Sequence, residues 1–123
     1  MSQAIDRVPA NLESCPGRPN CVSSQAAGSE QFVEPFRRTS ETDLQTLHSL
    51  LAEMPGCRVV TTTQIYLHAE FKSRYLRLVD DFELLVDNEK EVIQVRSASR
   101  IGYFDLGVNR QRVETLRSLY LRP

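Results

Sequence analysis

The residues best suited to chemistry gather in one stretch, Arg96 to Val113, where arginine, serine, glycine, asparagine and one aspartate occur without a continuous apolar run. Guanidinium groups bind carboxylates and phosphates through paired N–H donors, and the free amides at a helix N-terminus also attract anions. We therefore expect a site here for an anionic ligand or partner. The candidate residues are Arg96, Ser97, Ser99, Arg100, Asp105, Asn109 and Arg112.

The same stretch also has a purely structural interpretation. Arg96 and Arg100 would be neutralised by acids on a neighbouring strand. Gly102 and Gly107 would supply turns, and Asp105 would cap the last helix. This interpretation gives no structural role to a group of polar residues near the start of that helix. One of them, Arg112, has no obvious acidic partner. That group comprises Ser97, Ser99, Asn109, Arg110 and Arg112.

A second constellation, Cys21 with His68 and Asp81, contains the nucleophile, base and orienting acid of a small hydrolase or thiol enzyme. Against this, Cys21 lies in a proline-rich segment with no helix N-terminus directly after it to activate the thiol. His68 lies on an expected strand, where packing is the commoner use of the side chain. No catalytic residue is assigned, and whether the chain is an enzyme stays open.

Metal and cofactor sites are not expected. Asp80, Asp81 and Glu83 could bind a divalent cation, but strand alternation points Asp80 away from the other two, and nearby arginines compete for their carboxylates. The three cysteines, with His48 and His68, do not have the spacing of a closed four-ligand zinc site.

Length, charge and cysteine content limit the class of protein. A chain of 123 residues suits one domain, and its composition is typical of soluble proteins with no membrane span. The net charge of −1, with no row of aromatic residues beside the arginines, disfavours nucleic-acid binding. The N-terminus does not resemble a secretory signal, so we expect a cytoplasmic protein in which Cys15, Cys21 and Cys57 are reduced.

The periodicity of apolar residues predicts a single α+β domain. Residues 1–36 are expected to form an irregular arm that docks on a folded unit of residues 37–123. That unit should be an antiparallel meander of three to four strands with two helices packed on one face. The expected elements are a helix from Thr42 to Met54, strands over 57–71, 75–86 and 92–100, and a helix over 109–121.

Matching the apolar faces of the strands predicts their register. The expected pairs are Phe71 with Leu76, Glu70 with Arg77 and Tyr66 with Asp81 in the first hairpin, and Val86 with Ile93 and Glu83 with Arg96 in the second. Arg100 should lie diagonal to Asp81. The register also places Asp80 on the apolar face beside Ser99, where its carboxylate needs a hydrogen-bonding partner.

Four separated segments carry a resemblance to a known family. They are CPGRPNCVSS (Cys15–Ser24), HAEFKS (His68–Ser73), VDDFE (Val79–Glu83) and RSASRIGYFDLGVNRQRVETLR (Arg96–Arg117). In this order they resemble the uncharacterised family numbered 1499 among domains of unknown function. The resemblance implies a bacterial protein in which these segments belong together, and it implies no activity, ligand or cofactor.

Taken together, these observations predict a non-enzymatic binding or interaction module for an anionic ligand or partner. The polar face of the sheet and the stretch from Arg96 to Arg112 would form its binding surface. The alternative function is a small hydrolase or thiol enzyme that uses Cys21 and His68.

Overall fold

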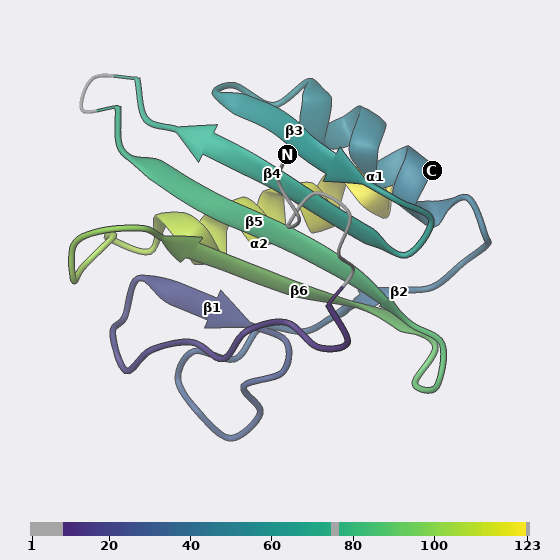
Figure 1. Ribbon diagram of the computed structural model, residues 1–123, viewed down its shortest axis with the longest axis horizontal. Helices are drawn as coiled ribbons and strands as arrows, with labels where there is room; N and C mark the ends of the chain where they lie inside the picture. Colours follow the sequence, from purple (N-terminus) through teal and green to yellow (C-terminus); the bar gives the residue numbers. More distant parts are fainter. Residues whose placement is uncertain (1–8, 75–76, 123) are drawn as a thin grey trace.

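The computed structural model describes residues 9–74 and 77–122, and it confirms a small α+β domain with an antiparallel sheet and two helices. In chain order the elements are β1 (Cys21–Ser23), β2 (Phe36–Arg37), α1 (Asp43–Ala52), β3 (Cys57–Thr62), β4 (Tyr66–Lys72), β5 (Val79–Asp87), β6 (Val92–Ser99) and α2 (Val108–Tyr120). Both helices lie behind the sheet, and residues 9–20, before β1, pass over the front of β6 (Figure 1). Within the described residues, no helix is both long and apolar enough to span a bilayer.

The sheet has six strands in the order β1-β6-β5-β4-β3, and β2 pairs with β6 as well. Strand β6 is therefore central: β5 lies along one edge, and the short strands β1 and β2 lie along the other. This arrangement brings the segment before the first helix into direct contact with the arginine-rich C-terminal part of the chain.

The expected number of strands, three to four, is wrong for two reasons. The segment expected to be one strand, 57–71, turns back on itself, because the Thr63 hydroxyl accepts hydrogen bonds from the amides of Ile65 and Tyr66. Strands β1 and β2 arise in and next to the segment expected to be irregular. Their pairing with β6 fixes them, and such short strands have no periodicity of their own to reveal them.

The second hairpin has the expected register. Val86 pairs with Ile93, and Glu83 pairs with Arg96. Here the turn after Asp87 is short, and its amides are held by the Asp87 carboxylate, which accepts a hydrogen bond from the Lys90 amide. Alternation and turn length point to the same pairing in this hairpin.

The expected register of the first hairpin is wrong. Phe71 pairs with Asp80, four positions beyond Leu76, which lies outside the described residues. The connection between the strands is longer than the expected pairing of Phe71 with Leu76 allows. Ser73 and Leu78 close it by hydrogen bonds in both directions, and Arg77 adopts a positive φ of 56°. The other observed pairs are Glu70 with Asp81, in place of Arg77, and Tyr66 with Leu85, in place of Asp81.

The core lies between the helices and the rear face of the sheet. Its fully buried side chains include Leu47, Leu51, Phe82, Leu84, Val113 and Leu116. Two apolar residues within the ranges expected to be strands, Ile65 and Leu78, lie in connections between strands and are exposed. Apolar periodicity thus located the two helices and the long strands, but it missed β1, β2 and the turn between β3 and β4, and it did not fix the ends of the elements.

Carboxylates hold the starts of both helices. Thr42, expected as the first residue of this helix, occupies the N-cap position of α1, and its side chain makes no capping bond. The adjacent Asp43 carboxylate instead accepts hydrogen bonds from the amides of Thr39 and Ser40. At α2 the Asp105 carboxylate accepts from the amides of Gly107 and Asn109, as the structural interpretation of this stretch predicted.

Candidate functional site

The candidate anion-binding residues do not converge on one surface. Side chains alternate along β6, so Arg96 and Arg100 extend to the open face of the sheet, whereas Ser97 and Ser99 face the helices. The remaining candidates, from the β6–α2 loop and α2, lie with the serines on the helix side.

Asn109 is the centre of the group on the helix side and is fully buried. Its Oδ1 accepts a hydrogen bond from the Ser97 hydroxyl at 2.6 Å. Its Nδ2 donates to Ser99 Oγ at 3.0 Å, to Asp105 Oδ2 at 2.8 Å and to the Asn20 carbonyl at 3.3 Å. One side chain therefore ties α2 to β6, to the β6–α2 loop and to the segment before β1.

Arg112 has an acidic partner, so the expectation that it lacks one is wrong. Its Nη1 lies 2.7 Å from Asp80 Oδ2, and its guanidinium lies 4.3 Å from the centre of the Phe71 ring. The reason is the register: Asp80 pairs with Ser99 on the helix side, as expected, and Arg112 reaches it from α2. Asp80 thereby has the hydrogen-bonding partner that its position requires.

The first amides of α2 and the Arg110 guanidinium are also engaged within the chain. The Asp105 carboxylate accepts hydrogen bonds from the amides of Gly107 and Asn109, and these amides are therefore not free to bind an anion. Arg110 donates to the carbonyl oxygens of Phe32 at 2.9 Å and Glu30 at 2.6 Å. These contacts fix the loop but leave the positive charge of Arg110 without a carboxylate partner among the described residues.

A chain of ion pairs runs across the open face. Arg100 lies diagonal to Asp81 as expected and contacts it through Nε at 2.8 Å, and its Nη2 lies 2.6 Å from Glu70. His68 Nε2 lies 2.8 Å from Asp81 Oδ1. Burial alone would raise the pKa of Asp81, but hydrogen bonds from Arg100 and His68 outweigh it and hold the pKa well below its ordinary value. The hydrogen bond to Asp81 raises the pKa of His68, against the opposing effect of burial.

A second polar group lies beneath the segment before β1. Arg96 Nη1 approaches Glu83 Oε1 at 3.7 Å, and its Nη2 donates to the Ser14 carbonyl at 3.5 Å. The Tyr66 hydroxyl donates to Glu83, and burial together with this carboxylate raises the Tyr66 pKa. Among the described residues Arg96 Nε is buried without a partner.

His68, Glu70 and Asp81 are close enough to hold a metal ion, since one ligand atom from each lies within 4.8 Å of the others. Their carboxylates are already neutralised by Arg100, and Glu70 also by Arg58 at 3.0 Å. A cation would have to displace a guanidinium group from both carboxylates. This group therefore functions as an ion-paired surface, and we assign no metal to it.

Cys21 forms a disulfide with Cys15, so the expectation that all three cysteines are reduced is wrong for these two. Proline and glycine between them fold the chain into a tight ring that brings the two Cα atoms within 5.6 Å. In this state Cys21 offers no thiolate, and two strands separate it from His68. Cys57 is free, and burial raises its pKa to about 11.

The structure contains a hollow that the sequence did not indicate. It lies between the disulfide ring, residues Cys15–Cys21, and the β6–α2 loop, residues 100–107, and has a volume of about 610 Å³. Tyr103 and Phe104 form part of its wall with their rings 4.8 Å apart, and they are 53% and 74% exposed. Arg18 also lines it, and no described residue forms an ion pair or hydrogen bond with its guanidinium group.

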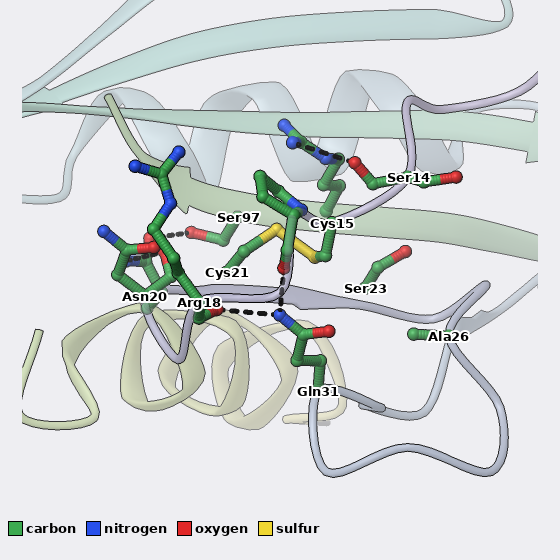
Figure 2. Close-up of a disulfide and its surroundings, with 12 residues drawn as sticks. Ser14, Cys15, Arg18, Asn20, Cys21, Ser23, Ala26, Gln31 and Ser97 are labelled. Atoms are coloured by element: carbon green, nitrogen blue, oxygen red, sulfur yellow. Dashed lines mark hydrogen bonds between the residues drawn. A yellow bond between two sulfur atoms is a disulfide. The ribbon is translucent and has the colours of Figure 1, made fainter. Parts of the chain in front are cut away.

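Hydrogen bonds hold both sides of this hollow in place. Gln31 Nε2 donates to the carbonyl oxygens of Pro16 and Arg18, each at 2.7 Å (Figure 2). Asn20, at the end of the ring, donates to the carbonyl of Gly102 at 2.8 Å and so fastens the ring to the β6–α2 loop. Figure 2 shows the Arg18 guanidinium extending from the ring, away from the Gln31 contacts.

One signal in the sequence could have revealed this hollow. The apolar residues of IGYFDLGV (residues 101–108) follow neither the period of a helix nor that of a strand, and two glycines interrupt them. Apolar residues in a turn-forming segment must be buried by another part of the chain or remain exposed. Whether these apolar residues are exposed depends on their contacts with the disulfide ring, and the sequence of residues 101–108 alone does not determine those contacts.

Comparison with known proteins identifies the family. The model of the family described as protein of unknown function, DUF1499, matches residues 11–119. The chain belongs to this family. No curated protein matches the chain. The four segments that carried the resemblance are neighbours in this fold. They contain β1 and parts of β4, β5, β6 and α2, and the strands adjoin in the order β1-β6-β5-β4.

Proposed function

We propose that this DUF1499 chain is a non-enzymatic binding module, and that its ligand is an anionic molecule with an apolar or aromatic body that enters the hollow. The observation that carries the proposal is the exposure of Tyr103 and Phe104 on the wall of a cavity that Arg18 also lines, and Arg18 has no partner in the part of the chain that the structure describes. A volume of about 610 Å³ lies within the usual range of small-molecule sites.

The chemistry of the wall defines the class of ligand. Covering two exposed aromatic rings removes apolar surface from water, which favours an apolar or aromatic group. The Arg18 guanidinium offers paired donors and a positive charge to a carboxylate, sulfonate or phosphate. The hydrogen bonds from Gln31 and Asn20 keep the walls in place before a ligand arrives, which reduces the entropic cost of binding.

In this proposal, the residues that the sequence analysis named as ligand-binding candidates hold the β6–α2 loop in position and do not contact the ligand. Ser97, Asp105 and Asn109 set the position of the β6–α2 loop, and the paired Arg100 and Arg112 stabilise the two sheet faces on either side of it. Ligand contact then falls to Arg18 and the aromatic pair.

The disulfide between Cys15 and Cys21 bears on the cellular compartment in which the chain acts. The cytoplasmic location expected from the sequence conflicts with a bond between Cys15 and Cys21, since such bonds persist mainly in oxidising compartments. We propose that the chain acts where this bond is maintained, because the bond closes the ring that carries Arg18.

The test uses 8-anilinonaphthalene-1-sulfonate, a dye that combines an aromatic body with an anionic group. Tyr103→Ser and Arg18→Gln should each weaken dye binding by about fivefold or more, because each removes one of the two kinds of contact. Arg122→Gln, the same exchange at an exposed position at the other end of α2, is the matched control.

Fluorescence titration measures the affinity, and thermal melting shows that each variant is folded. If both hollow variants bind the dye as tightly as the wild type and the Arg122 control, the hollow is not the site.

A further inference from the structure

We infer that the tip of the β6–α2 loop, formed by Ile101, Phe104 and Leu106, docks on a lipid bilayer that contains anionic lipids. This surface adjoins the hollow: Phe104 belongs to both, but neither Ile101 nor Leu106 lines the hollow.

The tip concentrates exposed apolar side chains. Leu106 is 97% exposed, and Ile101 is 61% exposed, with Phe104 between them in the chain. Single exposed apolar residues are normal on protein surfaces, but a cluster of large ones marks an interaction site. Tyr103 and Val108, in and next to the same loop, are exposed as well. The remaining exposed large apolar residues among those described are scattered over separate turns, strand edges and helix ends; they are Val60, Ile65, Leu78 and Leu121.

The backbone conformation of Leu106 is unfavourable for a leucine and lowers the stability of the folded chain. Its φ is 57°, in the left-handed region that glycine and asparagine adopt more readily than a residue with a bulky side chain. Because the side chain is almost fully exposed, it gains no packing energy in return. Neither the backbone nor the core explains leucine at this position, and an unfavourable local choice of this kind is characteristic of functional sites.

The loop holds this tip in a fixed position. Asn20 Nδ2 contacts the carbonyl oxygens of Ile101 at 3.3 Å and Gly102 at 2.8 Å. On the other side of Leu106, the Gly107 amide donates to Asp105 at 2.8 Å. The tip is therefore presented in a defined shape, which reduces the entropy lost when it docks.

The shape and size of the tip favour a bilayer over a protein partner. The loop projects from one end of the sheet beyond β6 and the start of α2 (Figure 1). Three side chains that each bury at most about 200 Å² supply less than the roughly 800 Å² per partner of a stable protein interface. An apolar tip that enters the headgroup region needs no such area, because lipid surrounds it on all sides.

The charged residues that line the hollow beside the tip are Arg18, Arg110, Glu30 and Asp105, and Arg18 supplies the positive charge available to an anionic membrane surface. Asp105, the one acid of the loop, turns its carboxylate toward the amides of Gly107 and Asn109. Arg18 lines the same hollow as Phe104 and is exposed and without a partner among the described residues. Anionic headgroups would supply that partner once the tip is inserted.

The experiment compares binding to phosphatidylcholine vesicles with and without phosphatidylglycerol. We expect the wild type to float with the anionic vesicles and Leu106→Asn to bind them at least about tenfold more weakly, because a fully exposed leucine no longer enters the bilayer. Arg18→Gln should weaken binding by about fivefold and only to the anionic vesicles. Leu121→Asn, the same exchange at a 53% exposed position at the other end of α2, should bind like the wild type.

Leu106→Asn is a safe variant for the fold, because asparagine adopts the left-handed conformation easily, and its melting temperature should not fall. It should also keep the wild-type affinity for anilinonaphthalene sulfonate, so failure of this inference is distinguishable from failure of the proposed ligand site. Vesicle binding that survives in Leu106→Asn, or a wild type that binds neither kind of vesicle, would overturn the inference.

Discussion

Arginine side chains in this chain differ in what neutralises them. Arg100 and Arg112 are paired with carboxylates, and Arg110 donates to backbone carbonyl oxygens of the segment between β1 and α1. Arg117 does both, because it donates to carbonyl oxygens of that segment and also pairs with Glu114. Such contacts use the guanidinium group to join segments far apart in the sequence. Arg18 has neither kind of partner among the described residues. The density of arginine in the C-terminal segment therefore indicates structural cross-linking, and the arginine available to a ligand lies elsewhere.

The pairing of His68 with Asp81 predicts a dependence of stability on pH. The hydrogen bond to Asp81 raises the pKa of His68 in the folded state above the ordinary value of 6.5. Between the unfolded and folded pKa values, the folded state binds more protons than the unfolded state, so stability falls as pH rises. The contribution of His68 should be complete below pH 6.5 and lost as pH rises through the folded pKa.

Urea unfolding at a series of pH values measures this effect. His68→Gln should remove the decline above pH 6.5, and His48→Gln, on the exposed side of α1, should retain it. An identical slope in wild type and His68→Gln would show that the ion pair does not form in solution.

At the scale of elements, a helix or strand could be predicted from the sequence only where the apolar periodicity of that segment determines its structure. The two helices and the hairpin of β5 and β6 follow from apolar periodicity and a short turn. The register of β4 against β5 depends on a connection in which Arg77 adopts a positive φ without the glycine that usually marks one. Strand β1 exists because β6 pairs with it.

The candidate site shows the same limit. The sequence correctly placed Asp80 beside Ser99, and Arg100 diagonal to Asp81, because both follow from alternation along paired strands. It could not place Arg18 beside Tyr103, because that proximity depends on the disulfide ring and on contacts between residues more than 80 positions apart. Such contacts are properties of the tertiary structure.

Asn109 is the side chain on which the arrangement of these elements depends most. Asn109→Ala removes its hydrogen bonds and leaves the hydroxyl groups of Ser97 and Ser99 buried with fewer partners. We expect the free energy of unfolding to fall by about 1 to 3 kcal/mol, the usual cost of such a loss. Urea unfolding measures it, with Asn11→Ala at an exposed position as the control. Equal losses in the two variants would contradict the central role of Asn109.

At the scale of the whole molecule, the segment before β1 forms part of the folded unit. Leu12 is buried against Tyr66 and Leu85 on the open face of the sheet, and the Ser14 carbonyl receives a hydrogen bond from Arg96. The family match begins at residue 11 and so includes this segment. The helices cover one face of the sheet, and this segment covers part of the other. The disulfide fastens it to β1 and, through β1, to the centre of the sheet.

The disulfide between Cys15 and Cys21 should therefore contribute measurably to the stability of the whole domain. Closing so short a ring restricts the unfolded chain and stabilises the folded state by about 2 kcal/mol in the chain-entropy model. A reductant should lower the free energy of unfolding of the wild type by this amount and leave the double variant Cys15→Ala/Cys21→Ala unchanged. In the denatured, unreduced wild type, a thiol assay should detect one free cysteine, Cys57. Three free thiols in protein taken directly from its native compartment would show instead that the ring is open where the chain acts, as the cytoplasmic expectation implies.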